Sequence, residues 1–178
     1  MKVVISNSIS ANGFLARENG EEDWLPSEGW DEFLIDVDQF DNCVMGRKTY
    51  ELVTELYPNY NFDNVSTRHK VIVTRNKNFR IPKGYTVVGG PEEAIRYLKE
   101  RGIENTLVIG GGVLNSEFIK RKLVDEIWMT VTPYIIGKGR PVICQEDFDV
   151  KLSLISSDEL SKGRIQIKYQ VEKISLTT

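Results

Sequence analysis

Apolar residues in the first two thirds of the chain form short continuous runs and runs at helical spacing. Continuous runs bounded by glycine or polar residues predict buried strands, and helical spacing predicts amphipathic helices. Strands are expected at 2–9, 43–45, 70–74, 85–88 and 106–109. Helices are expected at 29–39, 49–56 and 113–120, with one more that begins at Pro91 and ends at Gly102. This alternation predicts a mostly parallel sheet flanked by helices.

The last third of the chain has a different pattern. A long apolar stretch predicts a strand at 126–136, and a second strand is expected at 151–156. Apolar and polar residues alternate strictly over 165–171, which is typical of an antiparallel strand with one face in solvent. The whole sequence therefore predicts an α/β fold with a mixed, mostly parallel central sheet and antiparallel C-terminal strands.

Length and composition narrow the classes of function. The 178 residues suit a single domain over 1–178, and 40% hydrophobic residues are enough for a sizeable core. The formal net charge of -3 provides no general attraction to nucleic acid or to an anionic membrane. Apolar runs stay well short of the roughly 20 residues that span a bilayer, and the chain begins directly with a strand. We expect a cytoplasmic protein that binds neither nucleic acid nor membrane.

The cysteine and histidine content argues against a metal site. Cys43 and Cys144 are far apart and lie outside any CxxC pattern, and His69 is the single histidine. A structural zinc site needs four such ligands. We interpret Cys43, at the start of an apolar run, as a buried thiol.

Three segments combine a strand end with residues that suit phosphate groups. In the first, Gly46, Arg47, Lys48 and Thr49 stand between a predicted strand and a predicted helix. Free backbone N–H groups and the helix dipole favour an anion there, and arginine can grip a phosphate with two donors. Thr49 can cap the helix or donate to a phosphate oxygen. The alternative is a capped helix with two solvated basic residues.

The second and third segments also stand at the ends of predicted strands. Thr74 and Arg75 follow an apolar strand, where parallel sheets bind ligands, and they suit a 2′-phosphate on an adenosine ribose. A polar turn is the alternative reading. Gly110, Gly111 and Gly112 join a strand to a helix, and three glycines let the backbone approach a pyrophosphate closely. The spacing fits neither GxGxxG nor a P-loop.

In this order, the three segments resemble the cofactor-binding parts of dihydrofolate reductases. The run 46–51 is similar to that family's Gly-Arg-x-Thr-aromatic-Glu motif, and the resemblance implies a three-layer fold that binds NADPH. By this similarity Thr74 and Arg75 contact the 2′-phosphate. The glycine run, with Val113 and Leu114, adjoins the pyrophosphate and includes a cis peptide between two glycines.

The N-terminal segment extends the resemblance. Residues 8–16 are similar to the family's first strand and the loop that closes over nicotinamide, so the backbone of Ser8, Leu15 and Ala16 is expected at the carboxamide. Segments 124–127 and 132–141 resemble the branch that contains the reductase of riboflavin biosynthesis, the C-terminal domain of a bifunctional deaminase–reductase. That resemblance implies a homodimer formed through the C-terminal strands.

One expected residue is missing. Dihydrofolate reductases use a carboxylate at the start of the first long helix, and that position falls here on Trp30. Asp31 is adjacent and is the one candidate for a catalytic or substrate-contacting acid, although neighbouring helix residues point in different directions. Asn7 and Thr130 are further candidates to line a substrate cavity, and 137–140 is a candidate basic lip for a phosphorylated substrate.

The leading hypothesis is an NADPH-dependent reductase of a small heterocycle, either a ribosylamino-pyrimidine or a pterin-like molecule. Two alternatives remain at this stage. One is a non-catalytic NADP-binding domain that acts as a sensor or scaffold, and the other is a true dihydrofolate reductase with a displaced acid.

Overall fold

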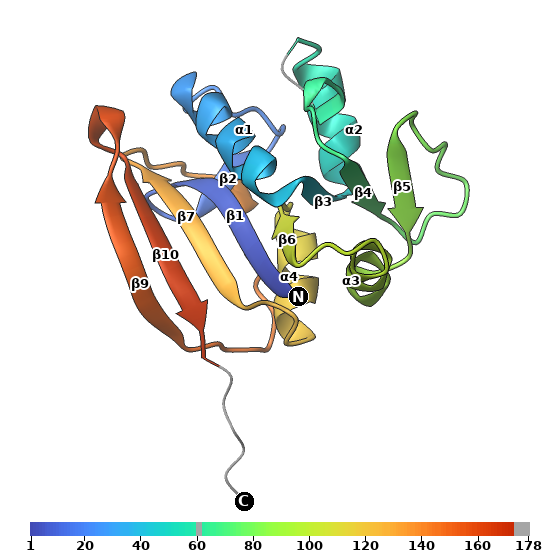
Figure 1. Ribbon diagram of the computed structural model, residues 1–178. Helices are drawn as coiled ribbons and strands as arrows, with labels where there is room; N and C mark the ends of the chain where they lie inside the picture. The colour runs from blue at the N-terminus through green and yellow to red at the C-terminus, as the bar shows by residue number, and fades with distance from the viewer. Residues whose placement is uncertain (60–61, 173–178) are drawn as a thin grey trace, which may run out of the picture.

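The computed structural model describes residues 1–59 and 62–172 of the chain. A central eight-stranded sheet forms the middle of the molecule, with strand order β5-β4-β3-β6-β1-β7-β10-β9 (Figure 1). Its strands are β1 (Lys2–Ser10), β3 (Asn42–Gly46), β4 (His69–Val73), β5 (Tyr85–Val88), β6 (Asn105–Val108), β7 (Glu126–Thr132), β9 (Leu152–Glu159) and β10 (Ile165–Val171). In this order β6 lies between β3 and β1.

The sheet is mixed, as the sequence predicts. All pairs from β5 through β7 are parallel, whereas β10 runs antiparallel to both β7 and β9. The central strands are apolar on both faces because helices cover both faces. Val44 and Met45 of β3, for example, are adjacent residues that point to opposite cores and are both fully buried.

Within the described residues, four α-helices form the outer layers. On one face lie α1 (Glu28–Phe40) and α2 (Arg47–Leu56), which contribute Val37, Phe40 and Val53 to one core. On the other face lie α3 (Pro91–Lys99) and α4 (Gly112–Lys120), which contribute Leu98 and Phe118 to the second core. The three-layer α/β architecture is therefore confirmed.

Several predicted boundaries need correction. The predicted strand 126–136 ends at Thr132, because Pro133 has no N–H group to continue the ladder. The strand 70–74 ends one residue early, at Val73, and the strand 151–156 continues to Glu159. The helix expected at 49–56 begins at Arg47, so its N-cap is Gly46 and Thr49 does not cap it.

A small second sheet was not predicted. It pairs β2 (Phe14–Arg17) with β8 (Gly139–Pro141) in antiparallel fashion. Both strands are too short to show a hydrophobic period, so their pairing depends on the tertiary structure. The ribbon brings the N-terminal loop against the loop that follows β7, two segments more than 120 residues apart in sequence.

Candidate functional site

A cavity of about 1080 Å³ opens beyond the carboxyl ends of β1, β3, β4 and β6. Parallel sheets commonly bind ligands at this edge, because loops and helix N-termini converge there. All three phosphate-type segments recognised in the sequence contribute to its lining: Arg47, Thr74 and Gly111 all face the same cavity. A volume of this size is sufficient for a dinucleotide-sized ligand.

Hydrogen bonds join the first and third segments directly. The Gly46 N–H donates to the Gly110 carbonyl at 2.8 Å, and the Gly111 N–H donates to the Thr49 hydroxyl at 2.8 Å. The Gly110–Gly111 peptide bond is cis, as the resemblance to dihydrofolate reductases implies. The first turn of α2 and the glycine run therefore form one continuous wall, with the N-termini of α2 and α4 on it.

Position 112 requires glycine because the backbone of Pro141 and Val142 lies very close to it. A Cβ atom at this position would overlap the Pro141 carbonyl oxygen. On the same side, Gly139 packs against the Ala16 backbone of the β2–β8 ribbon. The glycines thus let the 139–142 segment close over the start of α4, and Leu15, Ala16 and Arg140 line the cavity from this ribbon.

The second segment, Thr74 and Arg75, lines the same cavity beyond the wall that the first turn of α2 and the glycine run form; this wall is called the phosphate wall below. The Thr74 N–H donates to the Val88 carbonyl, and its hydroxyl accepts a hydrogen bond from the Asn76 N–H at 3.1 Å. The Thr74 hydroxyl keeps its own hydrogen available to a ligand. Arg75 is exposed, and within the described residues it has no ion-pair partner.

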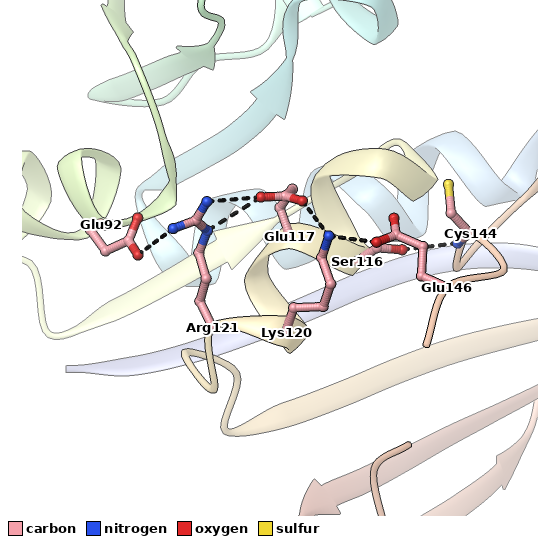
Figure 2. A network of polar contacts seen from close by, with 7 residues as sticks. All are labelled: Glu92, Ser116, Glu117, Lys120, Arg121, Cys144 and Glu146. Atoms are coloured by element: carbon pink, nitrogen blue, oxygen red, sulfur yellow. Dashed lines mark hydrogen bonds and ion pairs between the residues drawn. The ribbon is translucent and has the colours of Figure 1, made fainter. Parts of the chain in front are cut away.

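A network of charged side chains borders the cavity between α3 and α4 (Figure 2). Arg121 bridges Glu92 and Glu117, and Lys120 bridges Glu117 and Glu146. Hydrogen bonds from Lys120 and Arg121 lower the pKa of the Glu117 carboxyl group. The positive charge of Arg121 is therefore already balanced by its own neighbours.

The basic side chains of Arg47, Lys48 and Arg75 also line the cavity, and they differ from Arg121 in their ion-pair partners. Arg47 pairs with Glu51 four residues along α2, at 2.6 Å. Lys48 and Arg75 form no ion pair with any residue in the described ranges, so these two remain available to an anionic ligand.

The opposite end of the cavity is apolar and aromatic. The rings of Trp30 and Phe33 of α1 are tilted against each other with centroids 5.1 Å apart, and Phe33 meets Phe62 edge-on at 5.9 Å. Further lining residues at this end come from the β2–α1 segment and from α2: Gly20, Glu22, Leu25, Pro26, Leu52, Val53 and Tyr57. Such walls suit a flat ring held by contact on its faces.

Comparison with known proteins places this arrangement in a family. The family model of the RibD C-terminal domain matches residues 1–165. The chain belongs to the RibD C-terminal domain family. It is 26% identical to the uncharacterized protein YyaP of Bacillus subtilis over 179 residues, an alignment that covers 94% of each chain.

Solved structures agree on the fold of this RibD C-terminal domain. A Shewanella sp. PV-4 protein whose name refers to riboflavin biosynthesis matches with a TM-score of 0.82 at 23% identity, covering 97% of this chain and all of the other. Dihydrofolate reductase of Enterococcus faecalis, solved with NADP(H), matches with a TM-score of 0.68 at 16% identity, covering 97% of both chains. The dihydrofolate reductase-like fold is thereby established.

The cavity gathers almost every residue proposed from the sequence of this RibD-family chain. Thirteen of them line it, namely Ser8, Leu15, Ala16, Gly46, Arg47, Lys48, Thr49, Thr74, Arg75, Gly111, Gly112, Val113 and Leu114. Gly110 is buried just behind the wall, where its carbonyl holds Gly46. From the predicted basic lip, Gly139 and Arg140 line the cavity but Gly137 and Lys138 do not.

Asp31 is the exception. Its side chain is exposed on α1 and does not line the cavity, whereas the preceding Trp30 does. A turn of 100° per helical residue accounts for the difference. Asn7 lines the cavity as expected, and Thr130 lines a smaller adjoining pocket.

The sequence missed the aromatic end of the cavity. Trp30 stood out only as the position of the missing carboxylate, Phe33 lay within the helix expected at 29–39, and Glu22 carried no motif. The described residues contain no cluster of three or more side chains suited to a metal ion. Within the same residues, no helix is long and apolar enough to cross a membrane.

Proposed function

We propose that the protein is an NADPH-dependent reductase of a small heterocyclic substrate, a ribosylamino-pyrimidine or a pterin-like molecule. The observation that carries this proposal is the single cavity with two unlike ends, a wall of glycines and helix N-termini joined to an aromatic pocket. Membership of the RibD C-terminal domain family supports the same class of reaction.

The lining fits a phosphorylated dinucleotide. The N-termini of α2 and α4 suit the pyrophosphate, and Gly112 at the start of α4 adds no side chain to this wall. Bound nicotinamide would supply hydride, and the protein's own task is to position the substrate carbon against it. Ser8, Leu15 and Ala16 are proposed to contact the carboxamide, because they connect the phosphate wall to the aromatic end.

Arg75 is proposed to select NADPH over NADH. Calorimetric titration of the wild type should give tighter binding of NADPH, because a 2′-phosphate meets an unpaired guanidinium beside the Thr74 hydroxyl. Arg75→Gln should weaken NADPH binding about 10-fold and leave NADH binding unchanged, since one charge-assisted contact is worth about 1.4 kcal/mol or more.

Arg80→Gln is the matched control, because Arg80 is an exposed arginine in the same loop that does not line the cavity. Its NADPH affinity should equal that of the wild type. Equal affinity of the wild type for the two cofactors would contradict the assignment of a 2′-phosphate site.

Steady-state oxidation of NADPH against ribosylamino-pyrimidines and dihydropterins tests the catalytic proposal. Inactivity with intact cofactor binding would favour the non-catalytic alternative, a sensor or scaffold. Asp31→Asn is expected to leave any turnover of dihydrofolate unchanged, because Asp31 lies outside the cavity. A loss of turnover in this variant would instead support a displaced acid.

A further inference from the structure

The aromatic end of the cavity contains a carboxyl group, that of Glu22. Glu22 lies in the segment between β2 and α1 and is half-buried. The other acidic lining residue, Glu117, belongs to the phosphate end and is occupied by Lys120 and Arg121. Glu22 is therefore the acid that stands where a flat ring would be held.

The backbone of this segment is fixed against α2. The Glu22 N–H donates to the Tyr57 hydroxyl at 2.6 Å, just past the C-terminus of α2. Gly20, with φ of +95°, packs directly against the Leu52 side chain, and a Cβ there would overlap it. These two contacts hold Glu22 at the edge of the pocket that Trp30 and Phe33 form.

The Glu22 carboxyl group has no partner among residues 1–59 and 62–172. The Tyr57 hydroxyl, just past α2, interacts with the carboxylates of Glu22, Glu21 and Asp23. Asp23 is already paired with Arg17. Burial raises the pKa of Glu22 to about 7.

We propose that Glu22 is the proton donor of the reaction and that the substrate presents a C=N bond of a flat heterocycle to it. This inference rests on the proposed reductase function and assigns to Glu22 the role for which Asp31 is misplaced. A protonated carboxyl group can donate to a ring nitrogen and accept from a neighbouring N–H at the same time. That pairing selects pyrimidine- and pterin-type edges.

The chemical balance of the step is simple. The carbon of the C=N bond receives a hydride from the reduced nicotinamide, which is oxidised to NADP⁺. The nitrogen takes the proton of the Glu22 carboxyl group, so the C=N bond becomes CH–NH and Glu22 is left as a carboxylate. A proton from solvent restores the acid. A carboxyl group with a pKa near the working pH suits this cycle.

Pterin binding tests the proposal without requiring turnover. Quenching of pterin fluorescence is titrated with the protein, with and without NADP⁺, across the pH range around 7. We expect wild-type affinity to fall as pH rises through about 7. Glu22→Gln should keep the low-pH affinity of the wild type with little dependence on pH, because its neutral amide donates and accepts as the protonated carboxyl group does. Glu22→Leu should bind pterin about 10-fold more weakly at low pH, because the hydrogen bonds to the ring are lost.

Glu21→Gln is the matched control, since it makes the same chemical change at an exposed neighbour that does not line the cavity. It should retain the wild-type affinity and pH profile. The proposal is overturned if Glu22→Gln keeps the wild-type pH dependence, if Glu22→Leu keeps the wild-type affinity at low pH, or if pterin does not bind to the wild type. Binding of pterin without any binding of NADP⁺ would instead refute the proposed cofactor.

Two further readouts separate proton donation from mere contact. In protein labelled with ¹³C at glutamate carboxyl groups, the resonance that disappears in Glu22→Gln should titrate near 7 and shift when pterin binds. Titration near the ordinary value of 4.5 would overturn the assignment. With NADPH and 7,8-dihydropterin, Glu22→Gln should lower kcat about 100-fold and leave the KM for NADPH unchanged. Unchanged kcat would also overturn it.

Discussion

At the scale of single residues, burial is the main cause of the raised pKa values of Cys43 and Glu22. Cys43 is fully buried in β3, and desolvation raises the pKa of its thiol to about 12, so it is inert at neutral pH. Glu22 experiences the same effect at the cavity wall. The sequence predicted the buried thiol from its apolar neighbours, but it could not predict Glu22, whose neighbours Glu21 and Asp23 are polar and exposed.

The raised pKa of Glu22 predicts a pH-dependent stability. The folded protein binds a proton at this site more tightly than the unfolded chain does, so the contribution to stability is complete below about 4.5 and is lost as pH rises to about 7. Raising the pKa from 4.5 to about 7 corresponds to roughly 3 kcal/mol. In urea unfolding, the stability of the wild type relative to Glu22→Gln should fall across this interval and stay level above it.

Because both proteins share every other titrating group, the difference between them isolates Glu22. A constant difference for Glu22→Gln would mean that its carboxyl group has an ordinary pKa in the folded protein.

At the scale of elements, α1 is attached to the antiparallel half of the sheet by a buried ion pair. Arg164, just before β10, is 1% exposed and forms two hydrogen bonds of 2.7 Å with the Glu32 carboxylate. The same guanidinium also donates to the Ser161 carbonyl and hydroxyl. The pair holds α1, and with it Trp30 and Phe33, against a part of the chain 132 residues away.

Removal of this arginine should be costly. Arg164→Met is expected to lower the free energy of unfolding by about 3 kcal/mol or more, because it leaves the partly buried Glu32 carboxylate without its partner. Lys162→Met is the matched control, since the Lys162–Glu28 pair joins the same two regions but lies in solvent. Urea unfolding of both variants should therefore show a much larger loss for Arg164→Met, and similar small losses would contradict this account.

At the scale of the whole molecule, β9 is the edge strand on one side of the main sheet in the part of the chain that the structure describes. Leu154 and Ile155 of β9 and Ile165 of β10 are large apolar side chains that are 62%, 48% and 44% exposed. Exposed apolar side chains on the strands at the edge of a sheet are typical of an interaction surface. We therefore propose that the C-terminal strands form the interface of a homodimer.

Light scattering coupled to size-exclusion chromatography tests the dimer. The wild type should elute with twice the mass of one chain, and Leu154→Lys should shift the population to monomer, because a lysine would be buried without a partner at the interface. Ile81→Lys is a control at an exposed apolar residue far from these strands, with 58% of its surface exposed. A monomeric wild type would refute the proposal.

The sequence by itself determined the layered α/β fold and most of the phosphate wall. Hydrophobic periods and strand-ending motifs are local properties, and Gly46, Thr74 and Gly110 stand at strand ends whatever lies around them. Tertiary structure alone decided the other half of the cavity. Glu22, Trp30 and Tyr57 converge only because β2 and α1 fold back on α2, and the hydrogen bond from Glu22 to Tyr57 links residues 35 apart. The direction in which Asp31 points was likewise decided by the packing of α1, because a helix turns 100° between adjacent side chains.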